Sequence, residues 1–129
     1  TRQYYMLTGA LILIAEDQAF IALELALTIE DAGGKVAGPV ASVKDALALI
    51  DVQPITAAIL DFNLVDGDSI PIIAALTASQ TPAIIQSGIG LSPELMARFP
   101  SLVVFIKPSD PGAMVCVLRD LIDLRGQAR

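Results

Sequence analysis

The sequence predicts a single α/β domain, in which a parallel five-stranded sheet lies between two layers of helices. A length of 129 residues suits one domain. Short, continuous apolar runs alternate with longer amphipathic stretches, as strands covered on both faces alternate with helices. This strict alternation occurs five times, which indicates parallel strands joined by crossover helices, a (βα)5 three-layer sandwich.

The five strands are expected where short apolar runs are bounded by turn residues. They occupy residues 11–15, 35–40, 57–60, 83–86 and 102–106. Among doubly wound sheets, five parallel strands fit the flavodoxin-like strand order 2-1-3-4-5. Ligands of such sheets bind beyond the carboxyl ends of the strands, so the informative residues should directly follow each strand.

The first two helices carry clear start and stop signals. The first, expected over 20–32, is rich in Ala and Leu and ends at Gly33-Gly34. Ser42 is expected to cap the second helix, with Asp45 three residues later in a capping-box pattern.

The last three helices also have recognisable first turns. Asp68 or Ser69 caps the third helix, which is expected to run through Ser79. The sequence Ser92-Pro93-Glu94 starts a short fourth helix. The last helix opens at Asp110-Pro111, and its apolar stripe has helical spacing. The stripe consists of Met114, Val117, Leu118, Leu121 and Ile122.

No repeat or linker divides the chain, so we expect a lead-in at 1–9, the domain at 10–125 and a tail at 126–129. Two apolar segments could also be interpreted as membrane or signal segments. Residues 69–93 carry no charge, but prolines and glycines interrupt them. The start, Arg2 followed by apolar residues at 6–15, could mimic a signal peptide, but the run is short and acidic residues end it. We expect a buried strand there and no membrane segment.

Composition excludes several classes of function. The net charge is -6 and the 8 Lys and Arg residues are scattered, which argues against nucleic-acid binding. The chain has no histidine, which removes Ser-His and Cys-His catalysis and most zinc sites. Its one cysteine, Cys116, cannot form an internal disulfide. A reducing, cytoplasmic setting is the simplest interpretation.

Polar residues follow four of the predicted strands. Glu16-Asp17 follows the first, Asp61 the third, Ser87 the fourth and Lys107-Pro108 the fifth. Carboxylates brought together at one sheet edge repel one another, and a bound divalent cation relieves the repulsion. Ligands that are all oxygens favour a hard ion, Mg2+ above others.

A metal beside a carboxylate can support phosphoryl transfer. Asp61 would then be the nucleophile that attacks phosphorus and becomes an acyl phosphate. The Lys107 ammonium and the Ser87 hydroxyl could donate to the phosphoryl oxygens.

These motifs resemble the signature of response-regulator receiver domains of two-component signalling. The resemblance rests on Glu16-Asp17, Leu60-Asp61-Phe62-Asn63-Leu64, Ser87-Gly88 and Lys107-Pro108, and it covers nearly the whole chain. It implies a phosphorelay switch rather than an enzyme that acts on other substrates. A histidine kinase or a histidine phosphotransfer protein would phosphorylate Asp61 with Mg2+. The chain could not itself supply the donor histidine.

The resemblance also implies a role for each motif residue. Glu16 and Asp17 would hold Mg2+ together with Asp61, Asp17 being the direct ligand, and the main-chain carbonyl of Asn63 would complete the metal shell. Ser87, with Gly88 beside it, would be the switch residue that binds phosphate. Lys107 would be the family's lysine, and Pro108 would follow it in a cis-type loop.

Two departures place the chain near one subfamily. Val104 stands where many receivers carry an aromatic switch residue, and Phe105, one place on, should face the other side of the sheet. Val65 stands where many receivers have proline. With Ser87-Gly88-Ile89 these departures resemble the "FAT GUY" receivers, with a partial match. Rearrangement of the loop 87–92 is therefore the expected route of signal output.

Two other functions stay open at this point. A haloacid-dehalogenase-like phosphohydrolase also uses an Asp nucleophile after a strand, but it needs an acid where this chain has Asn63. A degenerate receiver could act as a binding module without phosphorylation, which the missing aromatic at 104 allows. The chain could be a single-domain regulator or a receiver from a longer protein such as a hybrid kinase. A downstream protein partner is expected, and a homodimer could form through the last two helices and the fifth strand.

Overall fold

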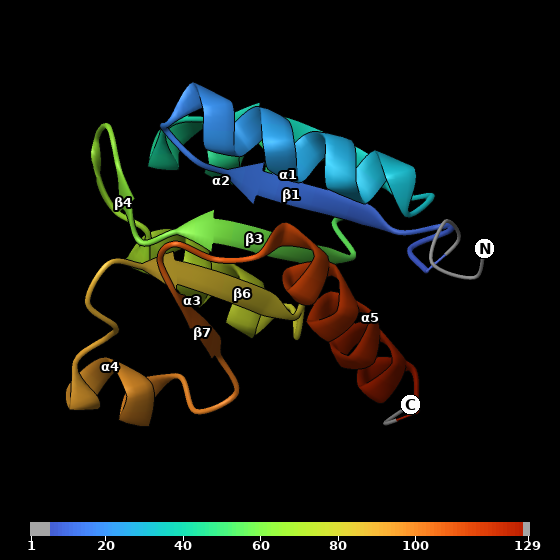
Figure 1. Cartoon of the computed structure of the whole chain (residues 1–129). Coiled ribbons are helices and arrows are strands. Elements are labelled where there is room, and N and C mark those ends of the chain that lie inside the picture. Colours follow the sequence, from blue (N-terminus) through green and yellow to red (C-terminus); the bar gives the residue numbers. More distant parts are fainter. Residues whose placement is uncertain (1–5, 128–129) are drawn as a thin grey trace.

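The computed structural model describes residues 6–127 of the chain, and over this range it contains a five-stranded parallel sheet (Figure 1). The strand order is β2-β1-β3-β6-β7, which is the predicted order 2-1-3-4-5 when the sheet strands are counted along the chain. The strands are β1 (Leu11–Ala15), β2 (Lys35–Val40), β3 (Ala57–Asp61), β6 (Ala83–Ser87) and β7 (Val103–Ile106). The predicted fold class is therefore confirmed.

Helices cover both faces of the sheet. The helices are α1 (Ala19–Asp31), α2 (Val43–Val52), α3 (Ile70–Ala78), α4 (Pro93–Arg98) and α5 (Pro111–Gln127). One core cluster joins α1 and α5 to sheet residues such as Ile12 and Ile14, and a second joins α2 and α3 to Leu13 and Ala15. Successive residues of β1 thus enter opposite cores, as the period of a strand requires.

The apolar stripe of α5 faces the first of these clusters. Met114 and Leu118 are fully buried, and the other three predicted stripe residues pack partly buried against the same cluster. Val115 is buried as well, although it lies outside the stripe. The start of α5 packs on both the sheet and α1, so it buries a wider face than a single stripe predicts.

The helix ends largely follow the predicted signals. The hydroxyl of Ser42 accepts the backbone N–H of Asp45 at 3.0 Å, so Ser42 caps α2. Gly33, with φ of +86°, follows the end of α1 in a conformation that favours glycine. At α3, Asp68 rather than Ser69 provides the side-chain cap, because its Oδ1 accepts the N–H of Ile70 at 3.1 Å.

The segment predicted as a loop from Asp61 to Asp68 contains a small antiparallel hairpin. Its strands are β4 (Asn63–Leu64) and β5 (Gly67–Asp68), joined by a two-residue turn. Strands of two residues are too short to show a hydrophobic period, so the sequence pattern could not reveal them. The buried side chain of Leu64 anchors the hairpin to the second core cluster.

Smaller differences concern the ends of the fold. β3 and β6 each extend one residue beyond the prediction, so Asp61 and Ser87 are the last residues of these strands. β7 begins one residue later than predicted, at Val103. Leu7, in the expected lead-in, packs in the core with 1% of its surface exposed. Residues 1–5 and 128–129 of the expected lead-in and tail lie outside the described residues.

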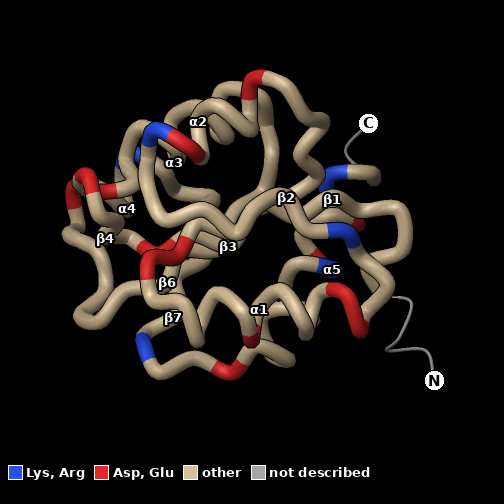
Figure 2. Tube along the Cα trace, turned by 90° about the horizontal axis from the view of Figure 1, so that it is seen from above, with Lys and Arg blue, Asp and Glu red and all other residues tan. Residues whose placement is uncertain are grey.

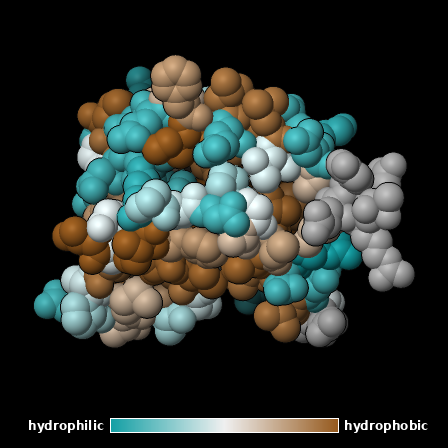
Figure 3. Space-filling model, in the orientation of Figure 1, coloured by the Kyte–Doolittle hydropathy of each residue, from teal (hydrophilic) through white to brown (hydrophobic). Residues whose placement is uncertain are grey.

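The surface of the described residues includes some large apolar side chains. Phe20, Leu23 and Leu27 of α1 are exposed, and Figure 3 shows hydrophobic surface along the edge formed by that helix. None of the described helices combines the length and hydropathy that crossing a membrane requires.

Candidate functional site

Acidic side chains meet where the central strands of the sheet end. Glu16 and Asp17 follow β1, and Asp61 closes β3, the neighbouring strand. One carboxylate oxygen from each of the three lies within 4.8 Å of the others. Figure 2 shows acidic segments meeting at this edge, near the labels of β3 and β6. The predicted convergence at the carboxyl edge is thus present in the fold.

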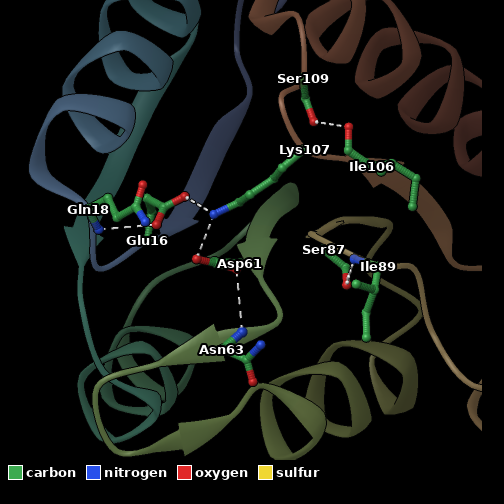
Figure 4. Close-up of polar contacts among 9 residues, drawn as sticks. All are labelled: Glu16, Gln18, Asp61, Asn63, Ser87, Ile89, Ile106, Lys107 and Ser109. Carbon is green, nitrogen blue, oxygen red and sulfur yellow. Dashed lines mark hydrogen bonds and ion pairs between the residues drawn. The ribbon is translucent and has the colours of Figure 1, made fainter.

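Lys107 reaches this cluster from the far side of β6. Its Nζ lies 2.9 Å from Asp61 Oδ2 and 3.3 Å from Glu16 Oε1, so one ammonium bridges two carboxylates (Figure 4). β6 lies between β3 and β7 in the sheet, so the lysine stem must pass over its end. The strand order thereby decides that a lysine 46 residues away contacts Asp61.

The three acids have different surroundings. Glu16 and Asp61 are buried, with 2% and 6% of their surface exposed, whereas Asp17 is exposed. The Oε2 of Glu16 also accepts the backbone N–H of Gln18 at 3.1 Å. Asp17 is therefore the acid with the freest access to a hydrated ion, and Glu16 is fixed by its neighbours.

Burial controls the protonation of Glu16. Desolvation, and then the nearby carboxylate of Asp61, raise the pKa of Glu16 from 4.5 to about 7, although the Gln18 N–H and Lys107 act in the opposite direction. Burial lowers the pKa of Lys107, but its contacts with Asp61 and Glu16 outweigh this and the net pKa is raised. Burial and the Asp61 carboxylate therefore outweigh the effect of the Lys107 ammonium on Glu16.

These residues fit a hard divalent cation. The donors are carboxylate oxygens, and burial leaves Glu16 with an unfavourable negative charge that a cation would stabilise. The backbone N–H of Asn63 donates to Asp61 Oδ1 at 3.4 Å, which places Asn63 beside the cluster. A metal contact of the Asn63 carbonyl stays a prediction.

The predicted switch residue Ser87 is turned toward its own loop. Its hydroxyl donates to the carbonyl oxygen of Gly90 at 2.9 Å. It also accepts the N–H of Ile89 at 3.4 Å (Figure 4). Binding a phosphoryl group on Asp61 would require this side chain to rotate away from Gly90. A Cβ at Gly88 would have open space, so glycine there is not required by packing.

The loop after β7 holds Lys107 at its start. The Lys107–Pro108 peptide is cis, and the hydroxyl of Ser109 donates to the carbonyl oxygen of Ile106 at 3.2 Å. The backbone N–H of Lys107 donates to the carbonyl oxygen of Ser87 at 2.9 Å, which ties this loop to the end of β6.

The side chains of β7 point as strand alternation predicts. Val104 pairs with Ile85, whose side chain enters the core under α2 and α3. Phe105 pairs with Gln86 and packs on the opposite core, against α1 and α5. Phe105 therefore lies on the other face from the expected switch position at 104.

Two polar residues beside the site were missed by the sequence interpretation. Asp66, at the tip of the β4–β5 hairpin, accepts two backbone N–H groups of α2, and these bonds lower its pKa. Gln86 lies in register with Asp61, is 2% exposed, and has a side-chain nitrogen with no hydrogen-bond partner among the described residues. An amide inside the apolar run 83–86 was the available signal for Gln86, and Asp66-Gly67 is a turn signal.

The fold is shared with several solved proteins. No protein-family model matches the chain, and no curated protein matches it by sequence. A CheY-like response regulator receiver domain protein from Methanospirillum hungatei JF-1 superposes with a TM-score of 0.82 at 20% identity, covering 93% of this chain and 98% of that one.

Two further structures agree in fold. The chemotaxis protein CheY4 of Vibrio cholerae has a TM-score of 0.74 at 24% identity, covering 87% of this chain and 98% of that one. A sensor protein from Polaromonas sp. JS666 is 30% identical, with a TM-score of 0.72 and coverage of 90% and 98%.

Proposed function

We propose that this chain, which belongs by fold with the CheY-like response-regulator receiver domains, is a switch that accepts a phosphoryl group on Asp61. The observation that carries the proposal is the ammonium of Lys107, which lies 2.9 Å from Asp61 within a cluster of carboxylates at the carboxyl edge of the sheet. Receiver domains act as signalling switches. We therefore propose no enzymatic activity on other substrates for this chain.

In the proposed reaction an oxygen of Asp61 attacks the phosphorus of the donor. A new carboxyl oxygen–phosphorus bond forms as the bond from phosphorus to the donor's leaving atom breaks. Lys107 stabilises the negative charge on the phosphoryl oxygens, since its ammonium already lies at the carboxylate that reacts. Buried surroundings strengthen this interaction, because Asp61 is only 6% exposed.

Glu16 and Asp17 would hold Mg2+ together with Asp61 and the Asn63 carbonyl. When bound, this ion would supply charge neutralisation at the phosphoryl oxygens. Ser87 would rotate from the Gly90 carbonyl and donate its hydroxyl to a phosphoryl oxygen, and Gly88 would let the loop follow. Pro108 would keep the loop after Lys107 in place.

The proposed phosphodonor is a histidine kinase or a histidine phosphotransfer protein, as the likeness to response-regulator receiver domains implies. The chain contains no histidine and so could not be that donor itself. A downstream protein would then bind the phosphorylated form in the cytoplasm. A homodimer through α4, β7 and α5 is supported by exposed apolar side chains on all three elements, namely Met96, Ile106 and Leu124. The proposed domain covers residues 10–125, with a lead-in at 1–9, of which Leu7 packs in the core, and a tail at 126–129, into which α5 continues.

Phosphate incorporation tests the proposal directly. Purified protein should gain one phosphoryl group from acetyl phosphate in the presence of Mg2+, as read by intact-mass measurement, and EDTA should abolish the gain. Asp61→Asn should stay unmodified because its amide is not a nucleophile, while Asp68→Asn, a carboxylate that caps α3, should be modified like wild type. Absence of incorporation in wild type, or incorporation in Asp61→Asn, would refute the proposal.

A binding module that works without phosphorylation is the second candidate. It is favoured by Ser87, whose hydroxyl is engaged with Gly90, and by Val104 at the usual aromatic position. In that case a partner would bind wild type and Asp61→Asn with equal affinity. An affinity that changes on phosphorylation would exclude this candidate.

A further inference from the structure

Two loops of the site make hydrogen bonds to one short segment, residues 40–44, which connects β2 to α2. The N–H of Glu16 donates to the carbonyl oxygen of Val40 at 2.9 Å, and the N–H of Val65 donates to that of Ala41 at 3.2 Å. Glu16 belongs to the acidic loop after β1, and Val65 belongs to the hairpin after Asp61. The segment is therefore hydrogen-bonded both to the acidic loop after β1 and to the hairpin that follows Asp61.

Asp66 accepts the shortest hydrogen bond between the hairpin and this segment. Its Oδ1 accepts the N–H of Val43 at 2.7 Å, and its Oδ2 accepts the N–H of Lys44 at 3.1 Å. The first N–H groups of a helix have no partner within the helix, and the helix dipole favours a negative charge there. The same two bonds lower the pKa of Asp66, so its carboxylate is charged at neutral pH. We call this contact of Asp66 with Val43 and Lys44 the Asp66 clasp.

The base of the hairpin, at Asn63, is hydrogen-bonded to Asp61. The N–H of Asn63 donates to Asp61 Oδ1 at 3.4 Å, and Asn63 pairs with Asp68 in the hairpin ladder. Leu64 is buried at the base, while Val65 and Asp66 form the exposed turn. Figure 1 shows the hairpin extending from the end of β3 toward the level of α2. A shift of Asn63 thus reaches Asp66 through a short, paired ribbon.

Modification of Asp61 changes the acceptor that Asn63 uses. An ionised carboxylate is a charge-assisted acceptor, which is stronger than a neutral one. In an acyl phosphate one carboxyl oxygen of Asp61 is bonded to phosphorus, so the carboxyl group is no longer ionised and the negative charge at this position is that of the phosphoryl oxygens. Phosphorylation would therefore weaken the hydrogen bond from Asn63, and the hairpin would then be free to move about the buried Leu64.

We propose that the Asp66 clasp reports the state of Asp61: it is closed while Asp61 is free and opens when Asp61 is phosphorylated. The first turn of α2 then becomes an output element. This inference rests on the proposed function and adds a regulated contact to it. An output route that does not use an aromatic switch residue agrees with the sequence of β7. Valine occupies position 104, where many receivers carry that aromatic residue, and Phe105 packs in the opposite core.

Hydrogen exchange at the amides of Val43 and Lys44 measures the clasp directly. NMR should show their exchange at least about tenfold faster when wild type is phosphorylated, which is within the usual range of coupling between sites. In Asp66→Asn the two amides should exchange fast in either state. Asp68→Asn is the matched control: it alters the same hairpin but caps α3, so it should keep the phosphorylation-dependent change.

Reciprocal coupling gives a second readout. A closed clasp favours unmodified Asp61, so Asp66→Asn should bind Mg2+ with beryllofluoride, an acyl-phosphate mimic, about tenfold more tightly than wild type. Asp68→Asn should bind it with wild-type affinity.

Each outcome is decisive. Wild type that gains phosphate by mass while exchange at Val43 and Lys44 stays constant overturns the clasp but leaves the proposed function standing. The wild-type comparison alone is enough if Asp66→Asn does not fold. Retention of the exchange response in a folded Asp66→Asn also overturns the clasp. Failure of wild type to gain phosphate removes the proposed function and the clasp with it.

Discussion

At the scale of single residues, the site is an arrangement of buried charges in which Glu16 has the least favourable position. Asp17 is exposed, and Asp61 receives the closer contact from Lys107, at 2.9 Å against 3.3 Å for Glu16. Glu16 is 2% exposed and shares the lysine. Its raised pKa is the consequence, and it makes the stability of the metal-free protein depend on pH.

We predict that Glu16 destabilises the metal-free fold as it ionises. The pKa of Glu16 is about 7 in the fold against 4.5 ordinarily, so the folded state binds the proton more tightly. The proton on Glu16 stabilises the folded state, and this contribution is complete below about pH 4.5. It is lost as pH rises to about 7, which lowers the free energy of unfolding by up to about 3 kcal/mol. Urea unfolding in EDTA across this range should show the loss in wild type.

Glu16→Gln isolates this contribution, because the amide keeps the size of the side chain but does not titrate. The unfolding free energy of wild type minus that of Glu16→Gln should decrease as pH rises from 4.5 to about 7, because only wild type loses stability there. Glu24→Gln, at an exposed position of α1, is the control and should leave the pH profile of wild type unchanged. A pH-independent difference at Glu16 would show that it is not protonated near neutrality.

At the scale of elements, the backbone must bring β2 close to β1 at the point where the acidic loop begins. Gly38 has φ of +96°, and the register between β1 and β2 shifts between Leu13 and Ala15. The shift lets the N–H of Glu16 donate to the carbonyl oxygen of Val40 at 2.9 Å. An irregularity in an edge strand thus positions an acid of the site.

Gly38→Ala should therefore be strongly destabilising. An added Cβ would lie 2.8 Å from the Val40 nitrogen and 3.0 Å from the Ile14 carbonyl oxygen, both of them backbone atoms that cannot move aside. We expect a loss of about 2 to 4 kcal/mol from the clash and the positive φ together. Thermal or urea unfolding measures it.

Gly126→Ala is the matched control for this substitution. A Cβ at Gly126 meets open space, and the residue lies within α5, where alanine is favoured over glycine by up to about 1 kcal/mol. It should be neutral or stabilising. A small effect at Gly38 comparable to that at Gly126 would mean that β2 relaxes around the new side chain.

At the scale of the whole molecule, the fold brings three acids together at one edge of the sheet, at a cost in charge repulsion. The loop after β1 supplies two carboxylates and the last residue of β3 supplies a third. Lys107 follows β7, which β6 separates from β3 in the sheet. Lys107 is one positive charge among them, but burial, and then the carboxylate of Asp61, still raise the pKa of Glu16. Binding of a cation should then stabilise the entire fold.

We predict that Mg2+ raises the melting temperature of wild type. A ligand that binds only the folded state adds about 2.7 kcal/mol at one hundred times its Kd. Each kcal/mol raises the melting temperature by about 4 to 8 °C for a domain of up to 100 residues and by about 2 to 4 °C for one of 150 residues or more, so the shift should be on the order of 10 °C. Asp17→Asn and Asp61→Asn should each reduce the shift, whereas Asp68→Asn should keep it. An equal Mg2+ effect in all four proteins would place the ion elsewhere.

The sequence by itself determined the strand order, most helix ends and the acids and lysine at the strand ends. It could do so because hydrophobic period and capping are local signals, and because parallel topology brings carboxyl ends to one edge. The tertiary structure alone decided that Lys107 is shared by Glu16 and Asp61, that Ser87 turns to Gly90, and that Asp66 bonds to the start of α2. Side-chain rotation and contacts between distant segments depend on packing around each atom, and no local pattern encodes that.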